Sequence, residues 1–215
     1  MQQQLADYRL FWNEFRRTFH DTGAILPSGR RLARALTHFV REGVSNGAAP
    51  RQILEVGSGT GAVTREILSA LGANDQLTLV ELNERFANRL RDRLRREPRW
   101  QAVSDRVEIM QASVEDLPES NRFDVIISGL PLNNFSLDLV ERLVSKMKRL
   151  LAADGTISFF EYIAIRRAKA AFSAHDERTR LNSIGQLLEQ LLAEREIRRD
   201  RVWANVPPAW VHHLR

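Results

Sequence analysis

The sequence of 215 residues contains no cysteine, and this absence excludes several kinds of site. Without thiols there is no disulfide framework, no zinc site with cysteine ligands and no cysteine nucleophile. Lysine is also scarce, because three of the 32 basic residues are lysine and the others are arginine. No apolar run approaches the length needed to span a bilayer, and no secretory signal is expected from the first residues. We therefore expect a cytoplasmic protein.

The charge balance is positive, at +5, and it leaves the partner open. A basic protein often meets nucleic acid or an anionic membrane surface, but a solvated arginine-rich surface has the same composition. The five histidines have no metal-ligand spacing and no cluster of acidic residues beside them, so no metal is expected.

Strand-like and helix-like segments alternate along the chain, which predicts βαβ units around a mostly parallel sheet. The predicted strands are residues 52–56, 77–81, 106–110, 123–128 and 156–162, and the predicted helices are 62–72, 83–96, 136–152 and 179–195. Two closing strands, 199–206 and 209–215, follow without a helix between them, so we expect them to pair antiparallel.

A glycine-rich loop, Gly57-Ser58-Gly59-Thr60-Gly61, lies between the first strand and the first helix. Gly57 permits a tight turn, and Gly59 lets a ligand approach the backbone closely. The N-terminus of the following helix offers free N–H groups and the positive end of a dipole. This arrangement is typical of a cofactor site at the carboxyl edge of an open sheet.

Two cofactor classes fit the loop. Gly57, Gly59 and Ala62 satisfy the loose dinucleotide pattern G-x-G-x-x-G/A, which keeps a nicotinamide dehydrogenase open. Glu81, about 20 residues after the loop, can accept both hydroxyls of a ribose, but dinucleotide folds use the same device. Glu55, two residues before the first glycine, distinguishes the classes better.

The run E-V-G-S-G-T-G from Glu55 to Gly61 resembles motif I of the class I S-adenosylmethionine-dependent methyltransferases. This resemblance implies a Rossmann-like α/β fold with a seven-stranded, mostly parallel sheet and a C-terminal antiparallel strand. It also implies S-adenosylmethionine as the cofactor. The implied cofactor-binding residues are Glu55, Gly57, Ser58, Gly59, Thr60, Gly61, Glu81, Leu82, Ser113, Val114 and Ser128.

Several longer segments resemble a narrower family, the bacterial N-methyltransferases of membrane lipids, which act on phosphatidylethanolamine or ornithine lipids. The similar segments are GAILPSGRRLARAL (23–36), LEVGSGTGAVTREIL (54–68), SGLPLNNF (128–135), FFEYIAIR (159–166) and VWANVPPAWVHHLR (202–215). The phosphatidylethanolamine branch resembles "TYGP" where this chain has Glu161-Tyr162-Ile163-Ala164. The resemblance therefore favours an ornithine-lipid enzyme.

Three residues are candidates for the chemistry on the acceptor amine. The loop at Leu130 follows the fourth strand and in this fold lies beside the reactive methyl group. Tyr162 could form an aromatic wall for the developing quaternary ammonium, and Glu161 could orient the amine or accept its proton. The two point to opposite faces of a strand, so we expect one of them to reach the substrate. A buried core tyrosine and a glutamate paired with a nearby arginine are the alternative without function.

The first 22 residues are predicted to form an amphipathic helix that precedes the methyltransferase-like domain of residues 23–215. Leu5, Tyr8, Trp12, Phe15 and Phe19 fall on one helix face, with arginines flanking them. Such a stripe suits either contact with an anionic membrane from the cytoplasmic side or a lid packed on the domain.

Other functions stay open at this point. An rRNA or other nucleic-acid adenine methyltransferase is compatible with the charge, but such enzymes have N-P-P-Y or N-L-P-Y where this chain has Ser128-Gly129-Leu130-Pro131. A membrane-binding module without activity would not need the glycines and Glu81. Of His212 and His213, one is expected to face inward as a structural histidine.

Overall fold

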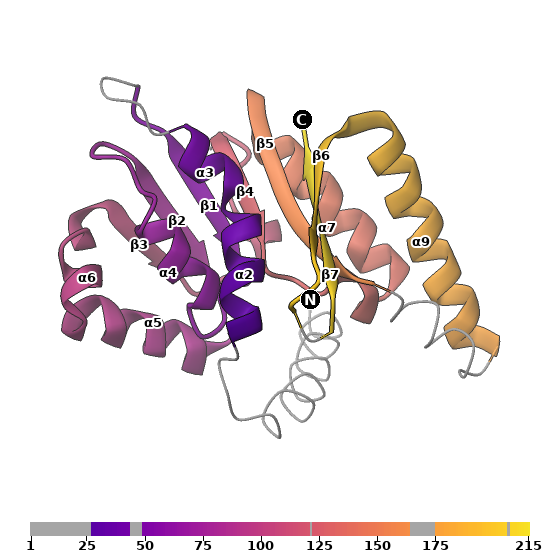
Figure 1. Ribbon diagram of the computed structural model, residues 1–215, viewed down its shortest axis with the longest axis horizontal. Helices are drawn as coiled ribbons and strands as arrows, with labels where there is room; N and C mark the ends of the chain where they lie inside the picture. The colour runs from indigo at the N-terminus through magenta and orange to yellow at the C-terminus, as the bar shows by residue number, and fades with distance from the viewer. Residues whose placement is uncertain (1–26, 44–48, 121, 164–174, 206) are drawn as a thin grey trace.

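The computed structural model describes residues 27–43, 49–120, 122–163, 175–205 and 207–215. Seven strands form one sheet in the order β3-β2-β1-β4-β5-β7-β6 (Figure 1). They are β1 (Gln52–Val56), β2 (Gln76–Val80), β3 (Val107–Met110), β4 (Phe123–Ser128), β5 (Leu151–Tyr162), β6 (Glu196–Val202) and β7 (Ala209–Leu214). The first five pair in parallel, and β7 is antiparallel to both neighbours. The predicted α/β sheet is confirmed, whereas the predicted helix of residues 1–22 lies outside the described residues.

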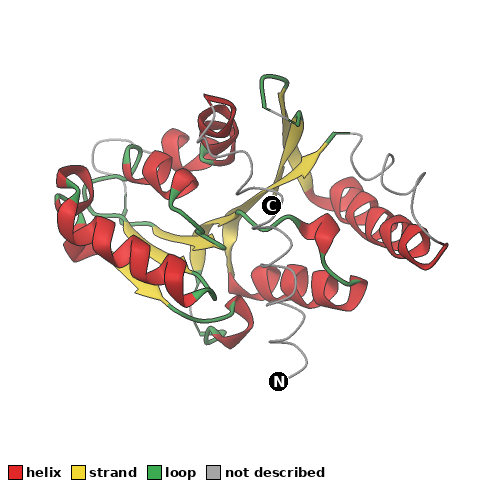
Figure 2. Cartoon of the chain, turned by 90° about the horizontal axis from the view of Figure 1, so that it is seen from below, coloured by secondary structure: helices red, strands yellow, loops and turns green. Residues whose placement is uncertain are grey.

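Helices cover both faces of the sheet, as Figure 2 shows. One layer contains α2 (Pro27–Leu36), α3 (His38–Glu42), α4 (Ala62–Leu68), α5 (Glu84–Arg96) and α6 (Pro98–Gln101), and the other contains α7 (Leu137–Leu150) and α9 (His175–Arg195). Successive strand residues enter different cores: Ile53 packs with the first layer and Leu54 with the second. This burial on both faces explains the nearly continuous apolar strands of the sequence.

Three elements begin three or more residues earlier in the chain than the sequence pattern predicts. β5 begins at Leu151, directly after α7, and its early residues Ala153 and Asp154 are exposed. α9 begins at His175 and β6 at Glu196. These added segments are polar or exposed, so they have no apolar periodicity by which a sequence could reveal them.

Both candidate histidines are buried, although the sequence predicts that one of them faces inward. His213 lies with Nδ1 2.8 Å from the Ser158 hydroxyl oxygen and Nε2 3.2 Å from the Asp200 carboxylate. Burial lowers the pKa of His213 to about 4, so it is neutral at pH 7. His212, on the opposite face, has Nδ1 2.6 Å from the Glu196 carboxylate. A strand covered on both sides leaves neither face to solvent.

Candidate functional site

The glycine loop between β1 and α4 has left-handed backbone conformations at all three glycines. The φ angles are +73° at Gly57, +53° at Gly59 and +81° at Gly61. A β-carbon on Gly57 would lie 2.5 Å from the Leu130 side chain, whereas nothing lies within 4 Å of the same position on Gly59. A side chain at Gly57 would be strained by the positive φ and would displace Leu130, whereas Gly59 leaves open space above the backbone for a ligand.

Arg93 of α5 holds the outer side of this loop. Its Nη1 donates to the Thr60 carbonyl at 2.7 Å, and its Nε donates to the Glu97 carboxylate at 2.6 Å. The guanidinium also lies 4.9 Å from the ring centroid of buried Trp100. Arg93 was not among the predicted site residues, because it lies 33 residues from Thr60 along the chain.

Glu81 lies immediately after β2 and is 1% exposed. Its two carboxylate oxygens accept from the N–H of Gly59 at 2.7 Å and the N–H of Asn83 at 2.8 Å. Burial raises the pKa of Glu81, and the backbone donors oppose that rise. Each oxygen keeps a further lone pair, so this fixed carboxylate is suited to accept from two neighbouring hydroxyls of a ligand.

Glu55 is fully buried within β1 and faces α4, and it does not line the pocket described below. One carboxylate oxygen accepts from the Thr64 hydroxyl at 2.6 Å, and the other has no hydrogen-bond partner among the described residues. Burial raises its pKa to about 8. The Ser58 hydroxyl is also buried, and its interaction with the Glu55 carboxyl opposes the rise in that pKa. Glu55 and Ser58 therefore support the glycine loop from behind, with Thr64 between β1 and α4.

A pocket opens where the carboxyl ends of β1, β2 and β3 meet the loop after β4. Its lining consists of Val56, Gly57, Val80, Glu81, Leu82, Ala112, Ser113, Val114 and Leu130. Six of these are residues that the sequence analysis selected, and Val56, Val80 and Ala112 are additional. Ser113 is held in position, because its Oγ accepts from the Glu115 N–H at 3.2 Å while its own N–H donates to Asp116 at 3.1 Å. The combination of a carboxylate with an apolar slot suits a nucleoside.

The loop after β4 packs against the glycine loop. The Gly129 N–H donates to the Val56 carbonyl at 2.8 Å, and a β-carbon on Gly129 would lie 2.8 Å from the Gly57 carbonyl oxygen. Ser128 is buried, and its hydroxyl oxygen accepts from the Leu130 N–H at 3.3 Å. Leu130 thus lines the pocket and also packs against Gly57.

Glu161 and Tyr162 lie at the carboxyl end of β5 and do not line this pocket. They point to opposite faces: Tyr162 packs edge-on to Phe160 at 5.1 Å between centroids, whereas the Glu161 carboxylate lies 3.9 Å from His212 Nε2. Burial raises the pKa of Tyr162 to about 12, so its phenol stays protonated and cannot serve as a base near neutral pH. An aromatic surface or a hydroxyl donor is what Tyr162 offers.

The buried carboxyl of Glu55 predicts a pH dependence of stability. Its pKa of about 8 in the folded protein exceeds the usual glutamate value of 4.5, so the folded state holds the proton more tightly. The associated stabilisation is complete below pH 4.5 and is lost as pH rises through about 8. Glutamine stays neutral at every pH, so Glu55→Gln should lack this loss of stability. Between pH 5 and pH 8 the unfolding free energy of the parent should therefore fall by about 4 kcal/mol more than that of Glu55→Gln.

Urea unfolding of the cofactor-free protein at several pH values measures this effect. Glu108→Gln, at an exposed position on β3, is the matched control because it removes a carboxylate without burial. If the unfolding free energies of the parent and Glu55→Gln change in parallel between pH 5 and pH 8, Glu55 is already ionised in the folded protein and the prediction is wrong.

Comparison with known proteins gives one family and several relatives. Residues 53–155 match the family model described as "Methyltransferase domain". An ornithine lipid N-methyltransferase of Singulisphaera acidiphila is 26% identical over 160 residues, which cover 72% of this chain and 77% of that protein. The ubiquinone/menaquinone biosynthesis C-methyltransferase UbiE of Ectopseudomonas mendocina is 30% identical over 112 residues. These residues cover 52% of this chain and 41% of that protein.

Among solved structures, the N-methyltransferase NodS of Bradyrhizobium japonicum in complex with S-adenosyl-L-homocysteine is similar in fold. It has a TM-score of 0.61 at 16% identity, with 88% of this chain and 87% of that chain covered. No helix in the described ranges is long and apolar enough to cross a membrane. In the same ranges, no group of three or more histidine and acidic side chains is arranged to hold a metal ion.

Proposed function

We propose that this chain, a class I S-adenosylmethionine-dependent methyltransferase, methylates the amino head group of a membrane lipid, with ornithine lipid preferred over phosphatidylethanolamine. The match to an ornithine lipid N-methyltransferase carries the proposal, because it extends over 72% of the chain. The match to the quinone C-methyltransferase covers 52% of the chain, so it supports a quinone substrate less well. The enzyme then works in the cytoplasm, peripherally on the inner face of the membrane.

The cofactor is S-adenosylmethionine, and the residues around the pocket have the chemistry to hold it. Glu81 would accept from the two ribose hydroxyls. Leu82 and Val114 would pack on the adenine, and Ser113 would offer it a polar contact. The backbone of the loop from Gly57 to Gly61 would receive the amino acid end, with Ser58 and Glu55 supporting the loop from behind.

Bound S-adenosylmethionine supplies a methyl group on a positively charged sulfur, which is already activated for in-line displacement. The protein therefore contributes mainly alignment, exclusion of water and contacts to the moving charge. An ammonium cannot attack, so the lipid amine loses its proton on entering a partly apolar site, where its pKa falls.

The acceptor amine is held by residues at the ends of β4 and β5. The carbonyls of Ser128 and Leu130 would accept from the amine. Tyr162 and Glu161 point to opposite faces of β5, so only one of them reaches the amine. Tyr162 would give an aromatic wall that favours the methylated ammonium, whereas Glu161 would orient the amine or accept its proton.

Mass spectrometry of lipids from a bacterial host that contains both ornithine lipids and phosphatidylethanolamine tests the proposal. On expression of this protein, we expect ornithine lipids heavier by one or more methyl groups. A Glu81→Ala variant provides the inactive control. Unchanged lipids, together with transfer of labelled methyl groups to quinones or to nucleic acid adenine in extracts, would refute the lipid assignment.

A further inference from the structure

Two large hydrophobic side chains of the described residues are well exposed, and both belong to β6 or to the turn after it. They are Ile197, 46% exposed, and Trp203, 61% exposed. Exposed tryptophan is uncommon, and a polar edge strand does not need it. Charged residues on an edge strand protect the sheet from pairing with another chain, and this explains the arginines of β6. It does not explain an exposed tryptophan at position 203.

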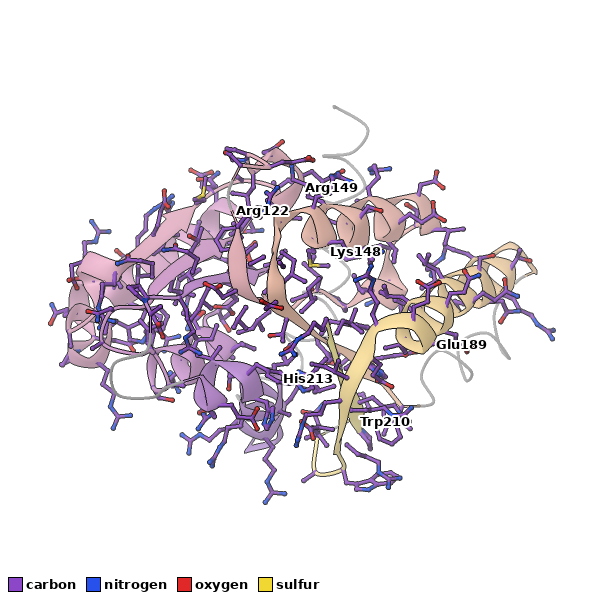
Figure 3. The ribbon with its side chains drawn as sticks, turned by 90° about the horizontal axis from the view of Figure 1, so that it is seen from above. Arg122, Lys148, Arg149, Glu189, Trp210 and His213 are labelled. Atoms are coloured by element: carbon purple, nitrogen blue, oxygen red, sulfur yellow. The ribbon has the colours of Figure 1, made fainter. Side chains whose placement is uncertain are left out.

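Trp203 is one end of a row of stacked side chains, which we call the Arg–Trp ladder. The Arg201 guanidinium lies 4.7 Å from the Trp203 ring centroid and 5.0 Å from that of Trp210. The Arg199 guanidinium lies 5.1 Å from the Trp210 ring centroid. The ladder thus consists of Arg199, Trp210, Arg201 and Trp203, and Figure 3 places Trp210 at the edge of the molecule, farther out than His213.

The arginines on the two faces of β6 have different partners. Arg198 forms two hydrogen bonds to the Asp200 carboxylate, at 2.7 and 3.0 Å, so its charge is largely neutralised. Arg199 and Arg201 instead lie against aromatic rings, and the nearest carboxylate oxygen to Arg199 Nε, on Glu196, is 4.0 Å away. The ladder therefore presents positive charge together with aromatic surface.

The ladder borders the proposed acceptor site. Arg201 is directly opposite Trp210 across the β6–β7 pair, and Trp210 is directly opposite Glu161 across the β7–β5 pair. Directly opposed residues share one face of a sheet, so the ladder is continuous with Glu161 at the carboxyl end of β5. A surface bound to the ladder lies next to the position that the acceptor amine must reach.

We infer that the Arg–Trp ladder docks on the headgroup region of an anionic membrane. Indole rings favour this region because one side is apolar and the N–H can stay hydrated, and guanidinium groups bind lipid phosphates. A second copy of the chain is disfavoured as the occupant, because two positive ladders repel. The choice of a membrane rests on the proposed function, since a lipid substrate must be drawn from a bilayer.

Sedimentation of the full-length protein with vesicles tests this surface without any measurement of activity. The vesicles contain either phosphatidylcholine alone or phosphatidylcholine with phosphatidylglycerol. We expect binding to the anionic vesicles that weakens with salt. We expect Arg201→Ser to weaken it about fivefold, the scale of one basic contact at such a surface. Trp203→Ser should also weaken it, because the ring loses its contact with the headgroup region. Arg89→Ser, at an exposed position on α5, removes the same charge from another part of the molecule and is expected to bind like the parent.

Unfolding temperatures equal to the parent show that the ladder variants remain folded. If they bind anionic vesicles as tightly as Arg89→Ser, or if the parent does not bind, the inference is wrong. Loss of binding to a single-stranded RNA oligonucleotide, with vesicle binding unchanged, would assign the ladder to nucleic acid instead. Vesicle binding that depends on the ladder, with unmodified lipids in the host, would refute the proposed substrate and not the docking surface.

Discussion

Replacing Glu81 with glutamine is expected to weaken the binding of S-adenosylmethionine by about ten- to a hundredfold. A hydrogen bond to a charged group contributes about 1.5–3 kcal/mol, and a tenfold change in affinity corresponds to about 1.4 kcal/mol. Glutamine keeps one acceptor oxygen, but its amide group would face the backbone N–H of Gly59 or Asn83, each of which donates to the parent carboxylate. Isothermal titration calorimetry measures the affinity directly.

Glu84→Gln is the matched control, because Glu84 is exposed at the start of α5, three residues further on. It should leave the affinity within about twofold of the parent, since a solvated carboxylate contributes little. Because burial raises the pKa of Glu81, the parent should also lose affinity as the pH is lowered into the range where Glu81 takes up a proton. Equal affinities for the parent and Glu81→Gln would show that Glu81 does not hold the ribose.

The central part of this site could be predicted because its signals are local. Three glycines between a strand and a helix, and a carboxylate at the end of the next strand, are fixed by spacing alone. The opposite directions of Glu161 and Tyr162 also follow from the two-residue period of a strand. For these residues the sequence determined which faces and ends they occupy, although their roles on a substrate stay predictions.

Features that depend on distant packing could not be predicted. Arg93 reaches Thr60 because α5 folds back under the glycine loop, and nothing near either residue in the sequence indicates this contact. The burial of both His212 and His213 requires helices on both faces of β7, one of them from the start of the chain. The Arg–Trp ladder likewise depends on the register between β6 and β7.

Alanine at Gly57 and alanine at Gly59 are expected to have different effects, although both positions have positive φ. A non-glycine residue in the left-handed region costs about 1–3 kcal/mol, so each substitution lowers stability. At Gly57 the added β-carbon would also lie 2.5 Å from Leu130, and such overpacking costs about 1–3 kcal/mol more. Gly57→Ala should therefore lower the free energy of unfolding by about 2–6 kcal/mol in urea.

Gly59→Ala meets no protein atom within 4 Å, so its cost in the cofactor-free protein is the backbone strain alone. Its β-carbon instead enters the space into which the ligand fits, and we expect S-adenosylmethionine binding to fall well below the limit of calorimetric detection. A double-mutant cycle separates the two mechanisms, because Leu130→Ala should recover part of the stability lost in Gly57→Ala and nothing in Gly59→Ala. If Leu130→Ala rescues neither substitution, the packing of Leu130 on Gly57 is not what couples the cofactor loop to the acceptor loop.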